Sequence, residues 1–403
     1  MGIVRLEEET QKAELEEFRR MLLSCAAVHR RKGDDGFRGQ ENAVPAGNGD
    51  VLDRLVCVTS GVSYLGIAIV NQLLVSGYSV RIIVDNQDSN YQISFHIGSS
   101  EILDHQSFFP EDVEKLREMG NSGEMRLNNS VVEVVMAKLT EVESLTEAFD
   151  GCRGVFHTAA FVDPAGLSGY SVYIGPLESS VNNKMMKEIV KAMADIEVNA
   201  SKNVIKACGV SRSVRHCVLT SSLLTCIWRE NPLDETSHLI DHKCWSDESV
   251  CLNKKLWYAL GKLRAEKAAW DIAKQSGLKL ATICPGLITG SKFYERNPTS
   301  TIAYLKGAQE MYTYGLLATV GIDKLAKAHV RVFEDMKKTA SGRYICFDQV
   351  IEREDEVEEL ARETGIKASS ITGGASCSNR PRFELSNAKL TRLMLRTRRC
   401  PIE

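Results

Sequence analysis

The chain has almost no net charge for its length. Its 403 residues include 50 lysines and arginines against 53 aspartates and glutamates, a formal charge of -3. The basic residues are scattered except near the C-terminus, so no broad positive field is present to attract a polyanion. We therefore expect no nucleic acid among the partners of this protein.

Long apolar runs are missing as well. No window approaches the eighteen consecutive apolar residues that indicate a membrane-spanning helix. The segment from Met1 to Glu9 ends in three glutamates, whereas a secretory leader begins with a basic segment followed by an apolar one. These absences predict a cytoplasmic protein without a membrane partner.

Cysteine is present in twelve copies, yet no two have the Cys-x-x-Cys spacing of a structural metal site. Cys57, Cys217 and Cys284 fall in apolar runs that predict buried strands, where a thiol behaves as a small hydrophobic group. The sequence therefore predicts no metal site, and its unpaired thiols suit a reducing compartment.

From Leu55 onward the chain alternates short apolar runs with helical patterns. Strands joined by helices in this way form a mostly parallel sheet covered by helices on both faces, which predicts the α/β class. The expected strands are 55–58, 79–84, 131–136, 154–157, 214–220 and 279–284, and the expected helices are 65–75, 145–149, 198–208 and 257–276.

The regions around this alternation differ in composition. A helix is expected over 6–29, either as an accessory element or as a contact for a helper protein, and a linker rich in Gly, Asp and Asn follows it. Two stretches, about 88–110 and 172–195, interrupt the alternation and are expected to be inserted loops. The expected organisation is an extension over 1–50, a sheet domain over 51–290, a smaller substrate lobe over 291–370 and a basic tail over 371–403.

Glycine is scarce at the turn where a dinucleotide-binding sheet needs it most. The run Thr59-Ser-Gly-Val-Ser-Tyr-Leu-Gly66 follows the first strand, where glycines let the backbone approach a pyrophosphate at a helix N-terminus. Aligned to Gly-x-x-Gly-x-x-Gly, the chain has Ser60, Ser63 and Gly66, with Gly61 one residue out of register. The turn indicates a nucleotide site, although the motif is weak by itself.

Asp85 follows the second expected strand, at the position whose side chain faces the adenosine ribose. A carboxylate there accepts hydrogen bonds from both ribose hydroxyls and repels a 2′-phosphate, so Asp85 predicts NADH in preference to NADPH. The alternative is an exposed aspartate that opens a turn at Asp85 and Asn86.

Tyr258 and Lys262 form the most informative pair in the chain. They lie four residues apart in the run Trp257-Tyr-Ala-Leu-Gly-Lys262, which places a phenol and an ammonium on one helix face. Ser222 follows a strand that ends at Thr220, so its hydroxyl is expected at the edge where a site would form. The three form a candidate triad, because a phenol beside an ammonium can donate a proton to a carbonyl. Taken singly, each has a structural alternative: a turn cap, a helix aromatic and a solvated lysine.

Further segments carry a resemblance to a known family. They are Gly151-Cys-Arg-Gly-Val-Phe-His-Thr-Ala-Ala160, Val198-Asn-Ala-Ser-Lys-Asn-Val-Ile205, Val218-Leu-Thr-Ser-Ser222, Cys244-Trp-Ser-Asp247, Trp257-Tyr-Ala-Leu-Gly-Lys262, Ala265-Glu-Lys-Ala-Ala-Trp270 and Ser341-Gly-Arg-Tyr344. Together they cover roughly residues 54–350 in family order, which a single motif cannot imitate. In this they resemble the extended short-chain dehydrogenase/reductase superfamily, and within it the plant cinnamoyl-CoA reductase and dihydroflavonol reductase group.

The resemblance implies a Rossmann-type doubly wound parallel sheet with a smaller C-terminal substrate lobe, and NADPH as cofactor. It places Ser222, Tyr258 and Lys262 in the catalytic positions and implies that Asn199 supports the site from its helix. The residues expected to contact the cofactor are Thr59, Ser60, Gly61, Ser63, Tyr64, Leu65, Gly66, Asp85, Thr158, Ala159, Ala160, Tyr258, Lys262, Pro285 and Gly286.

The chain also departs from this family. The usual pattern has glycines at the nucleotide turn, an arginine after the second strand and Ala-Asp-Leu after the third. The run Lys255-Leu-Trp-Tyr-Ala-Leu-Gly-Lys262 keeps the catalytic residues and differs beside them, which leaves the substrate open. At the cofactor the departures are Ser60, Ser63, Asp85 and Ala137-Lys-Leu139.

From these features we expect an NAD(P)H-dependent oxidoreductase that transfers hydride to a carbonyl or an acyl-CoA thioester. The substrate class is a phenylpropanoid-like aromatic molecule, as in lignin biosynthesis. One alternative is a non-catalytic reductase fold with a regulatory or binding role, which the altered turn favours. The other is a ketone reductase of the dihydroflavonol type or an alcohol dehydrogenase.

Overall fold

The computed structural model describes most of the chain from Arg54 onward. The described residues are 54–61, 63–84, 132–158, 183–230, 238–290, 298–373 and 383–396. Several sequence expectations lie outside them: the helix over 6–29, the linker that follows it, the insertion at about 88–110, Asp85, Ala159 and Ala160.

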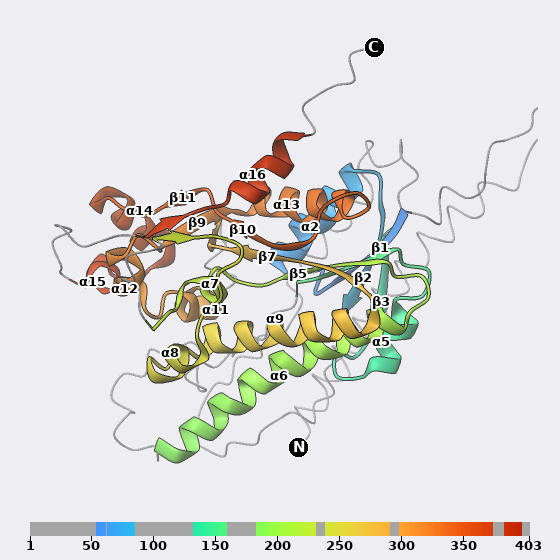
Figure 1. Ribbon diagram of the computed structural model, residues 1–403, viewed down its shortest axis with the longest axis horizontal. Coiled ribbons are helices and arrows are strands. Elements are labelled where there is room, and N and C mark those ends of the chain that lie inside the picture. The colour runs from blue at the N-terminus through green and yellow to red at the C-terminus, as the bar shows by residue number, and fades with distance from the viewer. Residues whose placement is uncertain are drawn as a thin grey trace, which may run out of the picture.

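A sheet of seven parallel strands forms the centre of the fold (Figure 1). Its strands are β1 (Leu55–Thr59), β2 (Ser79–Val84), β3 (Val132–Met136), β4 (Gly154–His157), β5 (His216–Thr220), β7 (Lys279–Pro285) and β10 (Gly342–Cys346). They lie in the order β10-β7-β5-β4-β1-β2-β3, so the chain crosses from one edge to the other side of β1 between β3 and β4. This is the expected Rossmann-type doubly wound sheet.

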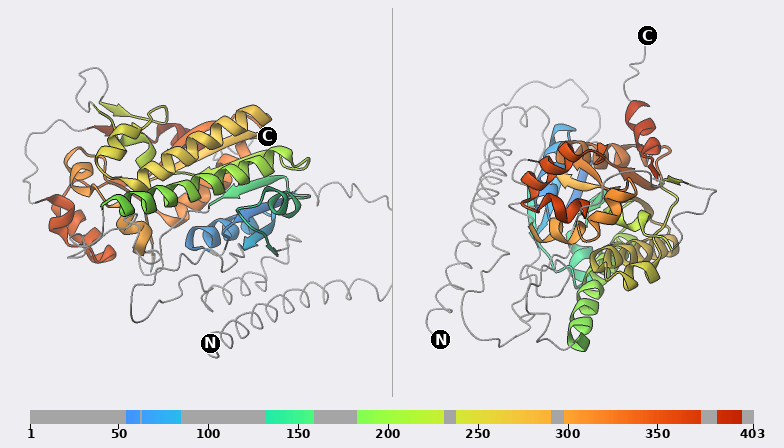
Figure 2. Two further views of the ribbon diagram at one scale, coloured as in Figure 1. Left: turned by 90° about the horizontal axis from the view of Figure 1, so that it is seen from below. Right: turned by 90° about the vertical axis from the view of Figure 1, so that its left-hand side faces the viewer.

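Helices cover both faces of the sheet (Figures 1 and 2). One face is packed by α2 (Tyr64–Val75), α13 (Ile322–Asp335) and α16 (Ala388–Leu395), and the other by α5 (Val142–Ala148), α6 (Asn183–Val210) and α9 (Trp257–Ser276). Side chains of β1 alternate between the faces: Val56 and Val58 belong to the apolar cluster with α2, and Cys57 to the cluster with α6. Burial on both faces explains why the strands read as near-continuous apolar runs.

A smaller lobe adjoins the sheet around its own apolar cluster. Its elements are β6 (Leu239–Ile240), β8 (Leu287–Thr289), β9 (Ala318–Gly321), β11 (Gln349–Val350), β12 (Glu384–Leu385), α7 (Leu224–Ile227), α8 (Glu248–Asn253), α11 (Pro298–Tyr304), α12 (Ala308–Thr313), α14 (Glu354–Thr364) and α15 (Ala368–Thr372). The chain beyond Gly290 contributes to both parts, because β10 pairs with β7 in the central sheet. The boundary expected at Gly290 therefore does not separate sheet from lobe.

Helix α6 is longer than expected. It begins at Asn183 rather than Val198, so the latter part of the segment expected as a loop over 172–195 is helical. Its amino-terminal end projects past the end of α9 in Figures 1 and 2, and Val204 and Ile205 of its later part are buried. Met186, Ile189, Val190 and Met193 are spaced as on one face of a helix, so the helical pattern begins before Val198, inside the stretch expected as an inserted loop.

The basic tail contains a docked helix. Leu390 and Leu393 of α16 belong to the apolar cluster on the α2 face, and the Lys389 ammonium donates a 3.0 Å hydrogen bond to the carbonyl of Arg343.

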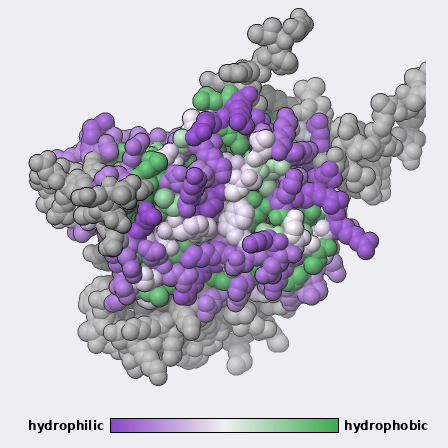
Figure 3. Space-filling view, viewed as in Figure 1, coloured by the Kyte–Doolittle hydropathy of each residue, from purple (hydrophilic) through white to green (hydrophobic). Residues whose placement is uncertain are grey.

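The nine cysteines within the described ranges are free thiols, and all of them except Cys244 are buried. On the face drawn in Figure 3 the surface is largely hydrophilic, with apolar residues in small separate patches. Among the described residues, no helix is both long and apolar enough to cross a bilayer.

Candidate functional site

The turn between β1 and α2 lies where a doubly wound sheet binds nucleotides. β1 has β2 on one side and β4 on the other, and the crossover between β3 and β4 makes this the point where strand order reverses. Ligands of such sheets bind in the crevice at the carboxyl ends of the strands at this point. Thr59 ends β1, and Ser60, Gly61 and Ser63 lead into α2, which begins at Tyr64.

The two glycines of this turn are required by packing. A Cβ atom on Gly66 would lie 2.1 Å from the carbonyl oxygen of Ser60, which backbone cannot accommodate. A Cβ on Gly61 would lie 2.7 Å from the Cγ2 atom of Ile82 on β2. Gly66 therefore allows the helix to approach the turn, and Gly61 allows the turn to approach the sheet.

Ser60 has a left-handed backbone with φ of +53°. Glycine adopts this conformation freely, whereas any residue with a Cβ atom is strained there by roughly 1–2 kcal/mol. The turn thus keeps the geometry of a glycine-rich loop even though the first glycine is a serine.

Ser63 is the N-cap of α2. Its Oγ accepts a 3.1 Å hydrogen bond from the backbone N–H of Gly66. The first N–H groups of a helix have no partner within the helix and are the donors that a bound phosphate uses. In this chain one of those donors is already taken by a side chain of the turn itself.

The fold and the turn geometry fit a dinucleotide, but the Gly66 N–H, which donates to Ser63 Oγ, is one backbone donor fewer for a phosphate. Thr59 and Thr158 extend the candidate site across β1 and β4, since the Thr158 backbone N–H donates a 3.2 Å hydrogen bond to Thr59 Oγ1. Tyr64 and Leu65 form the first turn of α2 beside them. The expected cofactor residues Thr59, Ser60, Gly61, Ser63, Tyr64, Leu65, Gly66 and Thr158 therefore lie together at the carboxyl ends of β1 and β4.

His157 lies under this crevice and links it to α6. Its Nδ1 is 2.9 Å from Thr59 Oγ1, and its Nε2 is 3.1 Å from Ser201 Oγ. Burial, with a contribution from the Lys262 charge, lowers the pKa of His157 to about 3, so the ring is neutral at neutral pH.

The two serines after β5 have different partners. Ser221 Oγ donates a 2.6 Å hydrogen bond to the Glu266 carboxylate. Ser222 is buried, and its Oγ accepts a 3.2 Å hydrogen bond from the backbone N–H of Leu224 at the start of α7. A hydroxyl that accepts in this way keeps its own hydrogen for donation to another group. Ser222, rather than Ser221, is suited to hold a developing oxyanion.

Tyr258 and Lys262 share one face of the first turns of α9. The Lys262 Nζ lies 5.8 Å from the centre of the Tyr258 ring. Tyr258 packs against the apolar cluster that contains Leu223 and Leu224, the residues that follow Ser222. The structure therefore brings the three predicted triad residues to the same end of the sheet, from β5 and α9.

Burial raises the pKa of the Tyr258 phenol, and the nearby charges act in opposite directions: Lys262 lowers it and Glu197 raises it. Burial disfavours the Lys262 ammonium, but the Glu197 carboxylate outweighs this and raises the pKa of Lys262. Tyr258 is thus a neutral phenol beside a charged ammonium at neutral pH.

Glu197 is the α6 residue that pairs with Lys262. Its Oε1 lies 2.7 Å from Lys262 Nζ, and both side chains are buried. Asn199, which the family resemblance implied as the support, is exposed on α6. Nothing near Tyr258 in the sequence points to Glu197, because the contact depends on how α6 and α9 pack.

Pro285 and Gly286 organise the backbone at the end of β7. The Pro285 carbonyl accepts a 2.7 Å hydrogen bond from the Leu223 N–H, and the Gly286 N–H donates a 2.9 Å bond to the carbonyl of Cys346. A Cβ on Gly286 would lie 2.5 Å from the Ala318 carbonyl oxygen. These two residues hold α7 and β10 against β7.

A buried ion pair joins α9 to β10. Arg343 Nε on β10 lies 2.8 Å from Glu266 Oε1, and the Arg343 guanidinium stacks 3.6 Å from the centre of the Trp245 ring. Glu266 also accepts hydrogen bonds from Thr282 Oγ1, at 2.7 Å, and Thr225 Oγ1, at 2.8 Å. Glu266 and Arg343 lie in segments that carry the family resemblance, although no pattern near either of them in the sequence points to this pairing.

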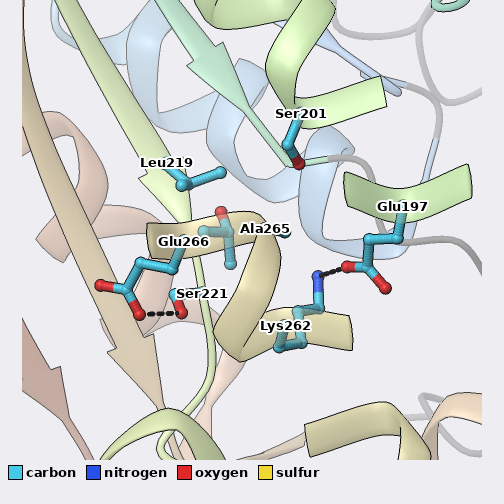
Figure 4. A pocket seen from close by; sticks show the side chains of 8 residues that line it. Glu197, Ser201, Leu219, Ser221, Lys262, Ala265 and Glu266 are labelled. Atoms are coloured by element: carbon cyan, nitrogen blue, oxygen red, sulfur yellow. Dashed lines mark hydrogen bonds and ion pairs between the residues drawn. The ribbon is translucent and has the colours of Figure 1, made fainter. Parts of the chain in front are cut away.

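A small pocket lies between α6, α9 and the end of β5 (Figure 4). In Figure 4 the Lys262 ammonium points toward Glu197, while Glu266 points to the opposite side of α9, toward Ser221. The lining residues are Glu197, Ser201, Leu219, Thr220, Ser221, Lys262, Ala265 and Glu266. Among the described residues, no group of three or more His, Cys, Asp or Glu is placed to hold a metal ion.

Known proteins resemble this chain in sequence and fold, although no family model matches it. The chain is 32% identical over 358 residues to cinnamoyl-CoA reductase 1 of Petunia hybrida, a match that covers 86% of this chain and 88% of that protein. It is 29% identical over 315 residues to tetraketide alpha-pyrone reductase 1 of Arabidopsis thaliana, covering 76% and 80% of the two chains. The fold is similar to that of the yeast methylglyoxal/isovaleraldehyde reductase Gre2 complexed with NADPH, with a TM-score of 0.53 and 17% identity over 84% of this chain and 92% of that one.

Proposed function

The chain belongs to the cinnamoyl-CoA reductase-like branch of the extended short-chain dehydrogenases/reductases and is an NAD(P)H-dependent reductase, and we propose that Ser222, Tyr258 and Lys262 are its catalytic residues. The observation that carries this proposal is the placement of a neutral phenol one helical turn from a buried ammonium on α9. Ser222 adds a hydroxyl hydrogen at the adjoining end of β5.

Each residue has a distinct task in carbonyl reduction. The Tyr258 phenol donates its proton to the carbonyl oxygen as negative charge develops there. Ser222 donates a hydrogen bond to the same oxygen, which stabilises the oxyanion. Lys262 provides positive charge beside the phenol and lowers the pKa that burial raises.

The cofactor site that we propose is the crevice beside β1. The turn from Thr59 to Gly66 would hold the pyrophosphate, and Thr158 would line the crevice on the β4 side. Lys262 would bind the nicotinamide ribose, having three donors of which one is used by Glu197. When bound, the nicotinamide supplies the hydride. The likeness to an NADPH complex favours NADPH, whereas Asp85, which lies outside the described residues, predicts NADH.

The proposed substrate is an aromatic acyl-CoA thioester, as the name of the Petunia relative suggests. Hydride addition to the thioester carbon and protonation of its oxygen by Tyr258 give a hemithioacetal. Its collapse breaks the carbon–sulfur bond and releases an aldehyde and the coenzyme A thiol. A ketone substrate, as the tetraketide pyrone relative suggests, would stop at the alcohol.

The test is turnover of the purified protein with a hydroxycinnamoyl-CoA thioester and NADPH or NADH, followed by product analysis. We expect an aldehyde product, and we expect Tyr258→Phe to lower kcat by about a hundredfold or more while the protein remains folded. Wild-type turnover in the phenylalanine variant would remove Tyr258 from the proton-donor role. An alcohol product from a ketone, with no thioester reduction, would favour the ketone reductase alternative.

A non-catalytic binding role is the second candidate, and the capping of Gly66 by Ser63 is the observation that favours it. A turn that satisfies its own donor offers less to a pyrophosphate. Calorimetric titration with NADH and NADPH separates the two candidates: binding of either supports the reductase, and binding of neither supports the non-catalytic protein. Tighter NADH binding would also support the ribose contact predicted for Asp85.

A further inference from the structure

Glu197 is a buried carboxylate at the centre of the candidate site. It lies on α6, is 3% exposed, and places Oε1 2.7 Å from the Nζ of Lys262, which is 5% exposed. At this distance the contact is a charge-assisted hydrogen bond. Figure 4 shows the two side chains reaching toward each other from neighbouring helices.

The other charged or titratable groups packed around Tyr258 and Lys262 leave this pairing intact. Glu266, one turn after Lys262 on α9, is paired with Arg343 at 2.8 Å. His157 on β4 is neutral, because burial and the Lys262 charge lower its pKa to about 3. Tyr304 on α11 stays a neutral phenol, because burial and then the nearby Tyr258 raise its pKa. Glu197 is therefore the carboxylate that faces the catalytic lysine within the described residues.

A lysine next to a catalytic phenol stabilises the phenolate, because opposite charge favours the ionised form. A carboxylate paired with that lysine reduces this effect, and it adds its own repulsion to a developing phenolate. In a site from which water is partly excluded, both effects are stronger than at the surface. The sign of Glu197's influence is therefore toward a protonated Tyr258, the form that donates a proton.

We propose that Glu197 is a positioning residue of the reductase site, whose carboxylate holds the Lys262 ammonium from α6 and keeps the Tyr258 phenol protonated for proton donation. This inference rests on the proposed function, in which Tyr258 and Lys262 are catalytic. It predicts that the site is set for reduction of a carbonyl rather than for oxidation of an alcohol, which needs the phenolate as base.

The test is a Glu197→Gln variant, which keeps the size of the side chain and removes its charge. Tyr258 ionisation is followed in the protein without cofactor by ultraviolet difference titration, with the titration of Tyr258→Phe subtracted. We expect the Tyr258 titration in Glu197→Gln to move to lower pH by on the order of one pH unit. The alkaline limb of kcat/KM for carbonyl reduction should move in the same direction by the same amount.

The controls separate charge from position. Glu197→Asp keeps the charge and withdraws it from Lys262, so we expect a lower kcat with a smaller movement of the Tyr258 titration. Glu248 of α8 makes a partly exposed 3.0 Å contact with Arg264, which lies on the same helix α9 as Tyr258. Glu248→Gln removes the charge from this contact and should change neither the Tyr258 titration nor kcat. If Glu197→Gln does not fold, the same comparison is made in a Lys262→Met background, where the unpaired buried ammonium is absent.

An unmoved Tyr258 titration in folded Glu197→Gln overturns the inference, even if turnover falls. Because the titration needs neither cofactor nor substrate, it also distinguishes this failure from that of the proposed function. A shifted Tyr258 titration in a protein without reductase activity would support the role of Glu197 and reject the catalytic assignment. If the Tyr258 titration shifts but the alkaline limb of kcat/KM does not move, that limb does not arise from Tyr258. This result would reject the proposal that Glu197 supports catalysis by keeping Tyr258 protonated.

Discussion

The turn after β1 and the face of α9 both belong to the reductase site, but they are supported in different ways. At the turn, Ser60 and Ser63 stand where the family usually has glycines, one in a strained backbone and one as a helix cap. On α9, Tyr258 and Lys262 keep the family spacing, and two buried ion pairs, Lys262–Glu197 and Glu266–Arg343, hold this helix. The substitutions have thus changed the expected cofactor-binding turn more than the expected catalytic residues.

A binding site tolerates substitution best where the backbone makes the contact with the ligand. A phosphate contact made by backbone depends on main-chain shape, which a serine can still adopt at a cost of roughly 1–2 kcal/mol. Proton transfer depends on side-chain identity and on the charges around it, and a missing partner in a buried pair costs more. We therefore expect substitutions in the buried ion pairs of α9 to change stability strongly, and substitutions at the turn to change it little.

The largest effect is expected from Arg343→Met. This change leaves the Glu266 carboxylate buried without its cation, which typically costs about 3–5 kcal/mol of unfolding free energy. Urea unfolding followed by circular dichroism measures it. The matched control is Arg264→Met, which removes a partly exposed 3.0 Å contact to Glu248 and should cost below about 1 kcal/mol. Equal losses in the two variants would show that the network behind α9 is no stronger than a surface pair.

The next effect is expected from Ser60→Gly, with opposite sign. Relief of the left-handed strain, offset by the greater freedom of glycine in the unfolded chain, should stabilise the protein by about 0.5–1 kcal/mol. Thermal unfolding with and without NADPH measures it. Lys255→Gly is the control, because Lys255 has a similar φ of +54° just before α9. Both variants should gain stability, and only a change at Ser60 should alter NADPH affinity; equal changes in affinity would contradict a role for this turn.

Much of this fold follows from sequence because its elements carry their own signals. The strands over 79–84 and 154–157 and the helix over 257–276 have the expected bounds. That helix ends where Gly277 adopts a left-handed backbone with φ of +71°, as a helix C-cap requires. Apolar runs buried on both faces and a glycine stop are local properties of a sequence.

The parts that sequence did not predict depend on contacts between distant segments. The pairing of Glu197 with Lys262 depends on how α6 packs beside α9, and no spacing within either helix encodes it. The cap that Ser63 forms on Gly66 is an exception, because serine is a strong N-cap residue and its place directly before the helix is a local signal for this contact.

The smallest effect on stability is expected from Ser63→Gly. Ser63→Gly frees the Gly66 N–H, so a bound pyrophosphate gains one donor and NADPH affinity should rise about threefold to tenfold. Loss of the cap should cost only a few tenths of a kcal/mol in stability, because glycine is itself tolerated at the N-cap. Calorimetry measures the affinity, and Ser63→Thr, which keeps the capping oxygen, is the control that should not gain. If the two variants bind NADPH equally, the self-cap does not compete with the cofactor, and the departure at Ser63 is neutral for the turn.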